Sequence, residues 1–159
     1  MASNEKAIIV TGAASGIGLA MSIALLTEGH DVTAVDRNAA TLNEMADRTA
    51  DLDGTLHLVP ADLTRPDACA HIVGAALVRF GRLDALVNNA GIGQASVRPG
   101  RSRDPIRFWE TTPEQWERFI AVNAAAPINM ARAVLPYMLA AQRGRIVTVT
   151  TSLGTMVRE

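Results

Sequence analysis

Short aliphatic runs alternate with longer stretches of helical periodicity along most of the chain. The runs show no alternation of apolar and polar residues, which is typical of strands buried on both faces of a parallel sheet. We expect five strands, over residues 7–11, 31–35, 55–60, 83–87 and 145–151. Because helical patterns separate them, the sequence predicts an α/β fold with a doubly wound parallel sheet.

Turn residues delimit the first three expected helices, which cover residues 17–28, 39–50 and 64–80. Gly29 and Gly81 follow the first and third helices directly, as glycine often does after a helix C-terminus. Thr64 is a candidate N-cap for the third helix. Cys69, the single cysteine, falls inside that helix, so we expect a small, buried or half-buried thiol and no intrachain disulfide.

The second half of the chain has a different sequence pattern. Residues 92–108 lack periodicity and are expected to form a long loop. Thr112 precedes proline at the first helical position and glutamine at the third, which is a capping-box pattern. The helix that starts there is predicted to continue to about residue 142, with kinks at Pro127 and Pro136.

Composition and charge narrow the class of protein. The 159 residues are 48% hydrophobic and 19% charged, which suits one domain with a real core and excludes a disordered chain. The formal net charge of −1 gives no support for nucleic acid or an anionic membrane as a partner. No run of about 18 unbroken apolar residues occurs, so we expect no membrane span and a soluble, cytoplasmic protein.

A glycine-rich turn, T-G-A-A-S-G-I-G over Thr11–Gly18, joins the first strand to the first helix. A dinucleotide pyrophosphate needs the free N–H groups and the positive dipole end of a helix. Gly12 allows a tight turn, Gly16 leaves room for phosphate, and Gly18 lets the helix approach the strand. An ordinary strand–helix turn also uses glycine, so this cluster alone is weak evidence for a phosphate site.

A carboxylate at the end of the second strand supports the same interpretation. Asp36 can accept hydrogen bonds from the hydroxyl groups of an adenosine ribose. It would also repel a 2′-phosphate, which favours NAD over NADP. Arg37 follows directly and softens that repulsion, so the preference is one of degree. The alternative is an aspartate that serves only the turn.

Further motifs at the strand ends resemble those of the short-chain dehydrogenase/reductase family. The glycine turn has the family's T-G-x-x-x-G-x-G form, and Asn88–Gly91 is identical to its N-N-A-G motif. Asp62 resembles the family's adenine-contacting aspartate, and Asn123 resembles the asparagine of its proton relay. The resemblance implies a Rossmann-type sheet in the order 3-2-1-4-5. It implies these cofactor-binding residues: Thr11, Gly12, Ser15, Gly16, Ile17, Gly18, Asp36, Arg37, Asp62, Leu63, Asn89, Ala90 and Gly91.

Two residues are candidates for the family's active-site hydroxyl. The family commonly has Ser-Ser, two further residues and then glycine. Counting back from Gly154 places Thr150 and Thr151 on the two serine positions. The serine, Ser152, lies one position later. Thr151 or Ser152 could therefore supply the hydroxyl, and we favour Ser152 because the family uses serine.

The family's Tyr-x-x-x-Lys pair does not occur in this sequence. Tyr137 is the single tyrosine, Ala141 stands four residues later, and the single lysine is Lys6. We expect Tyr137 to be a packing residue of the long helix. The sequence therefore predicts an apparently truncated dinucleotide-binding domain over 1–159, without the C-terminal strands and with little or no turnover. The alternative is a natural module that binds NAD or a partner without catalysis.

The resemblance also implies partners. The substrate would be a small-molecule alcohol or ketone, oxidised or reduced by hydride transfer. A homo-oligomer could form through the helix over 113–142. The four arginines of the Arg98–Arg107 segment are a weak argument for nucleic acid, since a solvated loop explains them much better.

Overall fold

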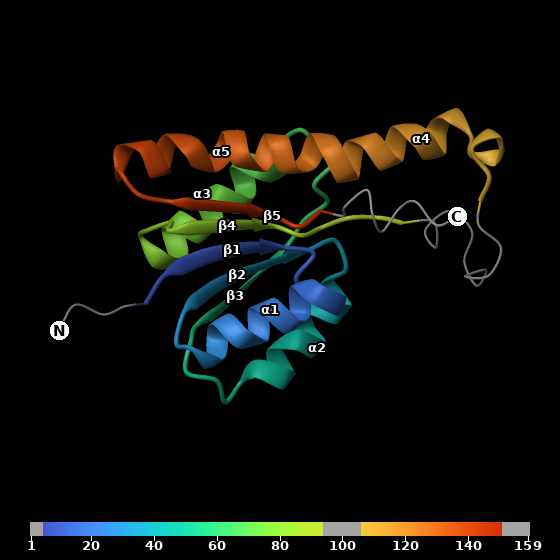
Figure 1. Cartoon of the computed structure of the whole chain (residues 1–159). Coiled ribbons are helices and arrows are strands. Elements are labelled where there is room, and N and C mark those ends of the chain that lie inside the picture. The colour runs from blue at the N-terminus through green and yellow to red at the C-terminus, as the bar shows by residue number, and fades with distance from the viewer. Residues whose placement is uncertain (1–4, 94–105, 151–159) are drawn as a thin grey trace.

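A five-stranded parallel sheet forms the centre of the computed structural model, which describes residues 5–93 and 106–150. Its strands stand in the order β3-β2-β1-β4-β5, and every neighbouring pair is parallel (Figure 1). The predicted doubly wound sheet and its strand order are confirmed. The strands are β1 (Ala7–Thr11), β2 (Asp31–Asp36), β3 (Leu56–Pro60), β4 (Ala85–Asn88) and β5 (Arg145–Thr148).

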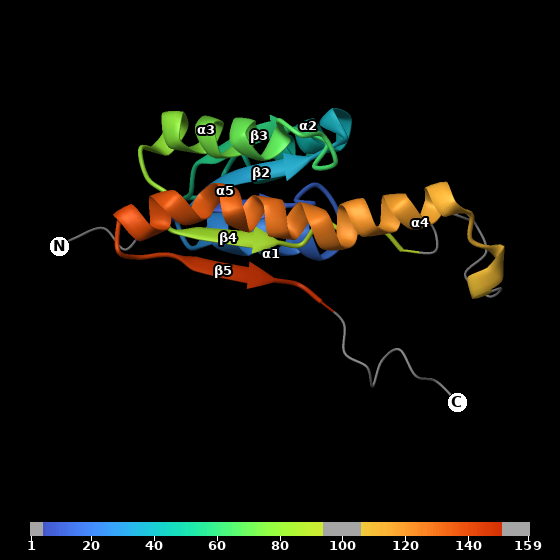
Figure 2. The same cartoon turned by 90° about the horizontal axis from the view of Figure 1, so that it is seen from above.

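Helices cover both faces of this sheet. Two of them, α1 (Gly16–Thr27) and α2 (Ala39–Thr49), lie on one face. On the other face lie α3 (Ala68–Phe80) and α5 (Ala126–Ala140), with α4 (Pro113–Ile120) leading into α5 (Figures 1 and 2). The sheet is therefore the middle layer of three, and only its edges and strand ends face outward.

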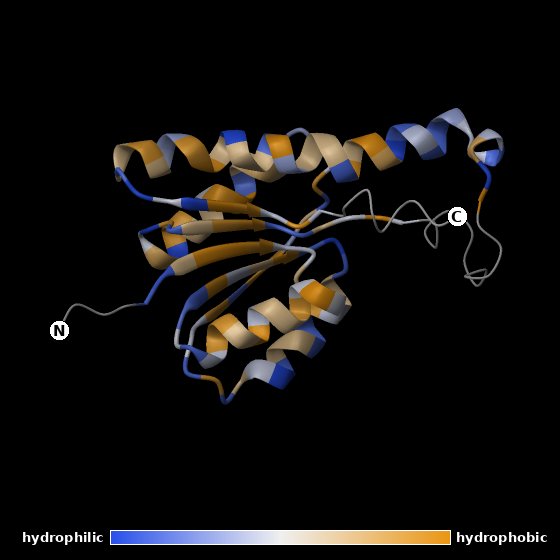
Figure 3. Ribbon diagram, in the orientation of Figure 1, coloured by the Kyte–Doolittle hydropathy of each residue, from blue (hydrophilic) through white to orange (hydrophobic). Residues whose placement is uncertain are grey.

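The core consists of two apolar clusters, one on each face of the sheet. Along β1, Ile9 points toward α3 and α5, while Ile8 and Val10 point toward α1 and α2. This alternation follows from the two-residue period of a strand. Both faces of the inner strands are therefore apolar, and in Figure 3 the strands carry the hydrophobic colour over most of their length. Cys69 belongs to the first cluster, as its predicted burial requires.

An ionic cluster ties the amino ends of three neighbouring strands together. Asp84, with a side chain 9% exposed, accepts a hydrogen bond from the Ala7 N–H at 2.9 Å. Its carboxylate also contacts the Nε atoms of Arg82 at 2.7 Å and Arg143 at 3.3 Å. Because Ala7 begins β1 and Arg143 precedes β5, this one carboxylate holds both strands against β4.

The predicted start of the third helix is wrong. The helix begins at Ala68, with Asp67 at the N-cap position, and not at Thr64. Thr64 donates both its N–H and its hydroxyl to the Asp62 carboxylate, which ties its side chain to the turn after β3. Aspartate commonly competes for backbone groups in this way, and it replaces the expected first turn with a local Asx turn.

The long helix begins with the predicted capping box, since Thr112 and Gln115 bond each other's backbone N–H groups. Its irregularity lies just before Pro127, one of the two prolines at which a kink was expected. A π-helical segment over Ala121–Ala125 precedes Pro127, whereas α5 runs through Pro136 without interruption. Proline lacks an N–H, so a break in the helical hydrogen-bond pattern just before Pro127 is one way to accommodate it.

Several boundaries and side chains also differ from expectation. The predicted loop over 92–108 ends in a 3-10 turn at Phe108–Glu110, and residues 94–105 of that loop lie outside the described residues. The fifth strand ends at Thr148, where its partner strand β4 also ends. Tyr137 is 48% exposed, so its assignment as a packing residue is wrong for the described chain.

Two apolar surfaces remain open on the described part of the molecule. All four residues of β5 are exposed along the outer edge of the sheet (Figure 2). The helical stretch Pro113–Ala140 is long and apolar enough to cross a membrane by length and composition. One face of it nevertheless packs on β4 and α3 through Met130, Val134 and Met138, as a core helix does. Length alone is therefore weak evidence for a membrane span.

Candidate functional site

A cleft of about 880 Å³ opens at the carboxyl ends of the strands. In a parallel sheet this edge is where ligands bind. Four walls line the cleft: the turn after β1, the end of β2, the segments after β3 and β4, and one face of α4. The predicted binding residues on these walls are Gly12, Ser15, Gly16, Ile17, Asp36, Arg37, Asp62, Leu63, Asn89, Ala90 and Gly91.

The glycine turn has the backbone geometry that its sequence predicts. Gly12 and Gly16 have φ values of +65° and +52°, in the left-handed region that favours glycine. A Cβ atom built on Gly16 would meet no atom within 4 Å, so open space lies beside it at the start of α1. A Cβ atom on Gly18 would overlap the Gly12 carbonyl oxygen. The turn therefore brings the helix N-terminus close to the strand and leaves room for a ligand.

A hydrogen-bond network fixes this turn to the segment after β4. The buried Thr11 hydroxyl accepts the N–H groups of Asn89 at 3.0 Å and Ala90 at 3.1 Å. The Asn89 amide group donates to the carbonyl oxygens of Thr11 at 3.0 Å and Gly12 at 3.2 Å. Two walls of the cleft are therefore held in one geometry, and Thr11 acts from beneath the cleft without lining it.

Asp36 stands at the end of β2, beside the glycine turn. One of its carboxylate oxygens accepts the Asn38 N–H at 3.1 Å, and the other accepts the Ala14 N–H at 3.4 Å. The second contact is long, so that oxygen retains capacity for a further donor. Asp36 is half-buried and faces the cleft, where a ribose hydroxyl could reach it.

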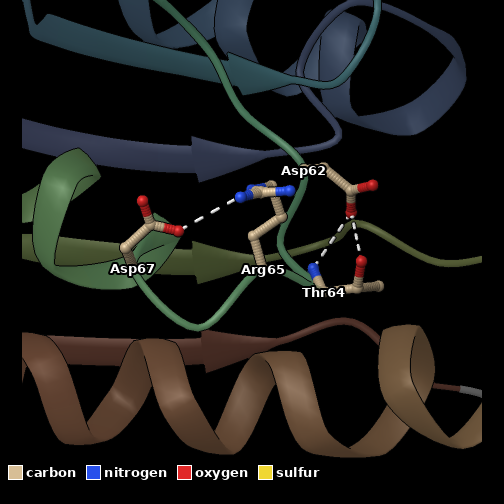
Figure 4. Close-up of polar contacts among 4 residues, drawn as sticks. All are labelled: Asp62, Thr64, Arg65 and Asp67. Carbon is tan, nitrogen blue, oxygen red and sulfur yellow. Dashed lines mark hydrogen bonds and ion pairs between the residues drawn. The ribbon is translucent and has the colours of Figure 1, made fainter.

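Asp62 follows β3 and forms the next part of the wall (Figure 4). One carboxylate oxygen accepts the Thr64 N–H at 3.0 Å and the Thr64 hydroxyl at 2.8 Å. These two hydrogen bonds lower the pKa of Asp62 below its ordinary value, and the positive charges of Arg37 and Arg118 lower it further. Asp62 is therefore ionised at neutral pH and able to accept another hydrogen bond.

Asn123 lies in the π-helical segment, next to the segment that follows β4. Its side-chain oxygen accepts the Ile92 N–H at 2.8 Å, and its amide group donates to the Ile92 carbonyl at 2.9 Å. Asn88, the first residue of the N-N-A-G motif, donates to the Pro127 carbonyl at 3.2 Å. Both asparagines therefore attach the long helix to the cleft, and the Asn123 side chain acts as a clamp.

The observed site differs from the sequence predictions in two groups of residues. The face of α4 that lines the cleft, with Glu114, Glu117 and Arg118, was not anticipated, because no spacing rule relates this helix to the strand ends. Thr151 and Ser152, the candidates for the active-site hydroxyl, lie outside the described residues. Within the described residues, no group of three or more His, Cys, Asp or Glu side chains is placed to hold a metal ion.

Comparison with known proteins gives one consistent result. A family model described as short chain dehydrogenase matches residues 6–159. The short chain dehydrogenase andC of Emericella variicolor is 36% identical over 151 residues, covering 94% of this chain and 54% of that protein. The 3-oxoacyl-[acyl-carrier-protein] reductase FabG of Thermotoga maritima is 32% identical over 149 residues, covering 94% and 56%.

Solved structures agree with this result. A metagenomic short-chain oxidoreductase in complex with NADP superposes with a TM-score of 0.81 at 32% identity, covering 96% of this chain and 63% of that one. A 7α-hydroxysteroid dehydrogenase complexed with NADH and 7-oxo glycochenodeoxycholic acid gives a TM-score of 0.82 at 28% identity, covering 97% and 56%. The chain thus spans little more than half the length of most of these relatives.

Proposed function

Because the chain belongs to the short-chain dehydrogenase family, we propose that its cleft binds a nicotinamide dinucleotide, with NAD preferred over NADP. The observation that carries this proposal is the convergence of three features at one edge of the sheet. They are the open glycine turn at the start of α1, the Asp36 carboxylate and the Asn89 network, which all lie at the carboxyl ends of the strands. In a family of oxidoreductases, such a site serves hydride transfer between the nicotinamide and an alcohol or ketone.

Different residues of the cleft would bind different parts of the dinucleotide. The pyrophosphate fits the start of α1, because Gly16 leaves open space there and the helix dipole favours negative charge. Asp36 would accept hydrogen bonds from the adenosine ribose, and Asp62 would accept one from the adenine. Leu63 and Ile17 supply apolar contact along the same cleft. The cofactor, when bound, supplies the hydride donor or acceptor.

The Asp36 assignment leads to a direct test. We expect Asp36→Ala to weaken NAD binding about tenfold, which corresponds to the loss of a hydrogen bond to a charged acceptor. NADP binding should weaken less, because the repulsion of its 2′-phosphate is also removed. The measurement is a calorimetric titration of the 159-residue chain with each cofactor.

Asp47→Ala is the matched control, since Asp47 is an exposed aspartate of α2 that does not line the cleft. It should leave both affinities unchanged. An unaltered ratio of NAD to NADP affinity in Asp36→Ala would show that Asp36 does not contact the ribose.

Catalysis needs a proton donor in addition to a bound cofactor. Proton transfer to the substrate oxygen needs a group with a pKa near the working pH, and a free tyrosine at about 10 does not meet that need. The family supplies a tyrosine activated by a lysine, and this sequence has no Tyr-x-x-x-Lys. Asn123 and the hydroxyl of Thr151 or Ser152 would be the family's remaining catalytic positions.

We therefore expect the 159-residue chain to bind NAD and to show no turnover above background with a panel of secondary alcohols. The measurement follows the formation of NADH by absorbance. A known, active member of the family is the positive control for the assay. Robust turnover by the purified chain would contradict the proposed catalytic incompleteness and would require a different proton donor.

A second candidate function is a module that binds NAD or a protein partner without catalysis. The missing Tyr–Lys pair and the exposed edge strand β5 both favour it. This candidate and the first share NAD binding, so a titration without heat or thermal shift would reject both. They differ at β5, where only the second candidate predicts a specific protein partner bound over the exposed strand.

The remaining proposals concern the state of the whole molecule. We propose one dinucleotide-binding domain over 1–159, a cytoplasmic location, and a homo-oligomer formed through the helix over 113–142. The last proposal is supported by the exposed apolar side chains spread along that helix: Trp116, Ile120, Ile128, Leu135, Tyr137 and Leu139. Neither nucleic acid nor a membrane is part of the proposed function.

A further inference from the structure

Two buried polar atoms lie without partners in the layer between the sheet and α3. Thr33 on β2 is 1% exposed, and its hydroxyl has no hydrogen-bond partner among the described residues. The Nε2 atom of His57 on β3 is likewise buried and unpaired among them. Burying a polar group without a hydrogen bond is costly, so this pair of atoms calls for an explanation that the proposed function does not give.

The parallel pairing of β2 and β3 places these two residues side by side. Thr33 and His57 are register partners, so their side chains leave the sheet on the same face. Val35 and Val59, two residues further along each strand, belong to the apolar cluster beneath α3 and identify that face. Neighbouring strands lie roughly 4.8 Å apart, so one water molecule can bridge a hydroxyl and an imidazole at such positions.

The surroundings of the His57 imidazole disfavour its charged form. The ring of Phe80 at the end of α3 meets it edge-on, with the ring centroids 6.1 Å apart. The guanidinium of Arg79 lies over the Phe80 ring, 5.4 Å from its centroid. Burial, and then the charge of Arg79, lower the pKa of His57 below its ordinary value of 6.5. The imidazole is therefore neutral at pH 7, and one of its nitrogens can accept a hydrogen bond.

The charged groups near His57 come from α3, the segment after it, and β2. Asp31 lies two residues before Thr33 and therefore on the same face of β2, but its charge acts on Arg82, which follows α3. The charge that acts on His57 is that of Arg79, and its positive sign opposes protonation. An imidazolium at this position would thus place a second positive charge near Arg79, in a mostly apolar layer.

We infer that Thr33 and the neutral His57 hold one buried water between them, which joins β2 to the edge strand β3 as an acid-sensitive latch. The water accepts the Thr33 hydroxyl and donates to Nε2 of His57, so both buried atoms gain a partner. Protonation converts Nε2 from an acceptor into a donor and reverses that hydrogen bond. Because β3 leads directly to Asp62, opening the latch loosens that wall of the cleft. The latch does not depend on a bound dinucleotide.

The latch gives stability a pH dependence of definite sign. The unfolded chain binds a proton at His57 near pH 6.5, whereas the folded chain binds it only at lower pH, so the folded state loses stability as the pH falls below about 6.5. Between pH 7.5 and 5.5 the unfolding equilibrium constant should rise about threefold to tenfold through this residue. His57→Gln should remove that rise. His71→Gln, at an exposed histidine of α3, is the matched control and should retain it.

NMR spectra of the histidine nitrogens and of bound water test the hydrogen bonds themselves. At pH 7 we expect the proton of His57 on Nδ1, an unprotonated Nε2, and a cross-peak between a bound water and the Thr33 methyl group. Thr33→Val should remove the water and the preference for the Nδ1–H tautomer, whereas Thr33→Ser should keep that preference. His71 serves as the reference in the same spectra. A neutral His57 protonated at Nε2, a tautomer unchanged in Thr33→Val, or a native pH dependence in His57→Gln would overturn the inference.

Discussion

Gly18→Ala should lower the free energy of unfolding by about 2–3 kcal/mol and should weaken NAD binding more than tenfold. Gly18 is buried, and a Cβ atom there would overlap the Gly12 carbonyl oxygen and would lie 2.5 Å from the amide nitrogen of Asn89. That carbonyl already accepts the Asn89 amide group, so it has no free direction in which to move. The start of α1 must instead shift away from the strand, which displaces the proposed pyrophosphate site.

Gly74→Ala provides the matched control, since it places the same methyl group on another helical glycine. A Cβ atom on Gly74 would meet nothing within 4 Å. This substitution should stabilise the chain by about 0.5–1 kcal/mol, because alanine loses less backbone entropy in a helix than glycine. Chemical denaturation and NAD titration of both variants check the pair. Native-like stability and NAD affinity in Gly18→Ala would contradict the described turn.

Asp84→Asn should lower the free energy of unfolding by about 2–3 kcal/mol at neutral pH, somewhat less than the full loss of a buried ion pair, because Arg82 and Arg143 are partly exposed. The substitution removes the charge that binds the two arginines and leaves the volume of the side chain almost unchanged. Since Asp84 joins β1 and β5 to β4, its loss should loosen both strands. Denaturant unfolding at pH 7 measures the effect.

The pH dependence of this effect has a definite sign. Burial raises the pKa of Asp84, but the hydrogen bonds from Arg82 and the Ala7 N–H and the charges of both arginines outweigh it, so the pKa lies below its ordinary value of 3.8. The stabilisation is therefore fully present above about pH 5 and is lost as the pH falls through the lowered value.

The difference between the native chain and Asp84→Asn should therefore be constant from neutral pH down to about pH 5, and it should shrink at lower pH. Asp67→Asn is the control. Its contact with Arg65 is 3.8 Å long between side chains 81% and 71% exposed, and asparagine suits the N-cap position of α3 as well as aspartate does, so the substitution should cost nothing measurable (Figure 4). A pH-independent difference for Asp84→Asn would refute the ionic role of Asp84.

The strands were predictable because burial on both faces leaves an uninterrupted aliphatic run. Residues 7–11 and 31–35 fall within β1 and β2 for this reason, and Gly81 ends α3 in the left-handed conformation that glycine favours. The capping box at Thr112 was equally visible, since two side chains at fixed spacing determine it. In each case a short stretch of sequence contains the whole physical cause.

Other features depend on competition that a pattern does not reveal. Thr64 resembled a helix cap, but Asp62 two residues earlier claims both of its donors. The π-helical segment before Pro127 places Asn123 against the Ile92 backbone, and that contact joins positions 31 residues apart. Tyr137 appeared to be a packing residue, yet it is 48% exposed, although it stands seven residues after the buried Met130 and therefore on a similar side of α5.

The candidate site likewise has a part that the sequence predicts and a part that only the structure reveals. Sequence order and strand ends were sufficient to place Gly12, Asp36, Asp62 and Asn89 on one cleft, because parallel strands carry their carboxyl ends to the same edge. The fourth wall, α4 with Arg118, could not be placed in this way. It follows a long connection after β4, and only the packed structure shows which of its faces meets the cleft.

The central claim is that NAD occupies the cleft at the carboxyl ends of β1, β2, β3 and β4. The most direct measurement is a titration of the isotope-labelled chain with NAD, followed by the backbone amide signals in NMR spectra. We predict saturable shifts at Gly16, Asp36, Asp62 and Ala90, with the amides around Asp84 at the amino ends of the strands unaffected. Shifts that are absent, or that are centred away from these four residues, would contradict it.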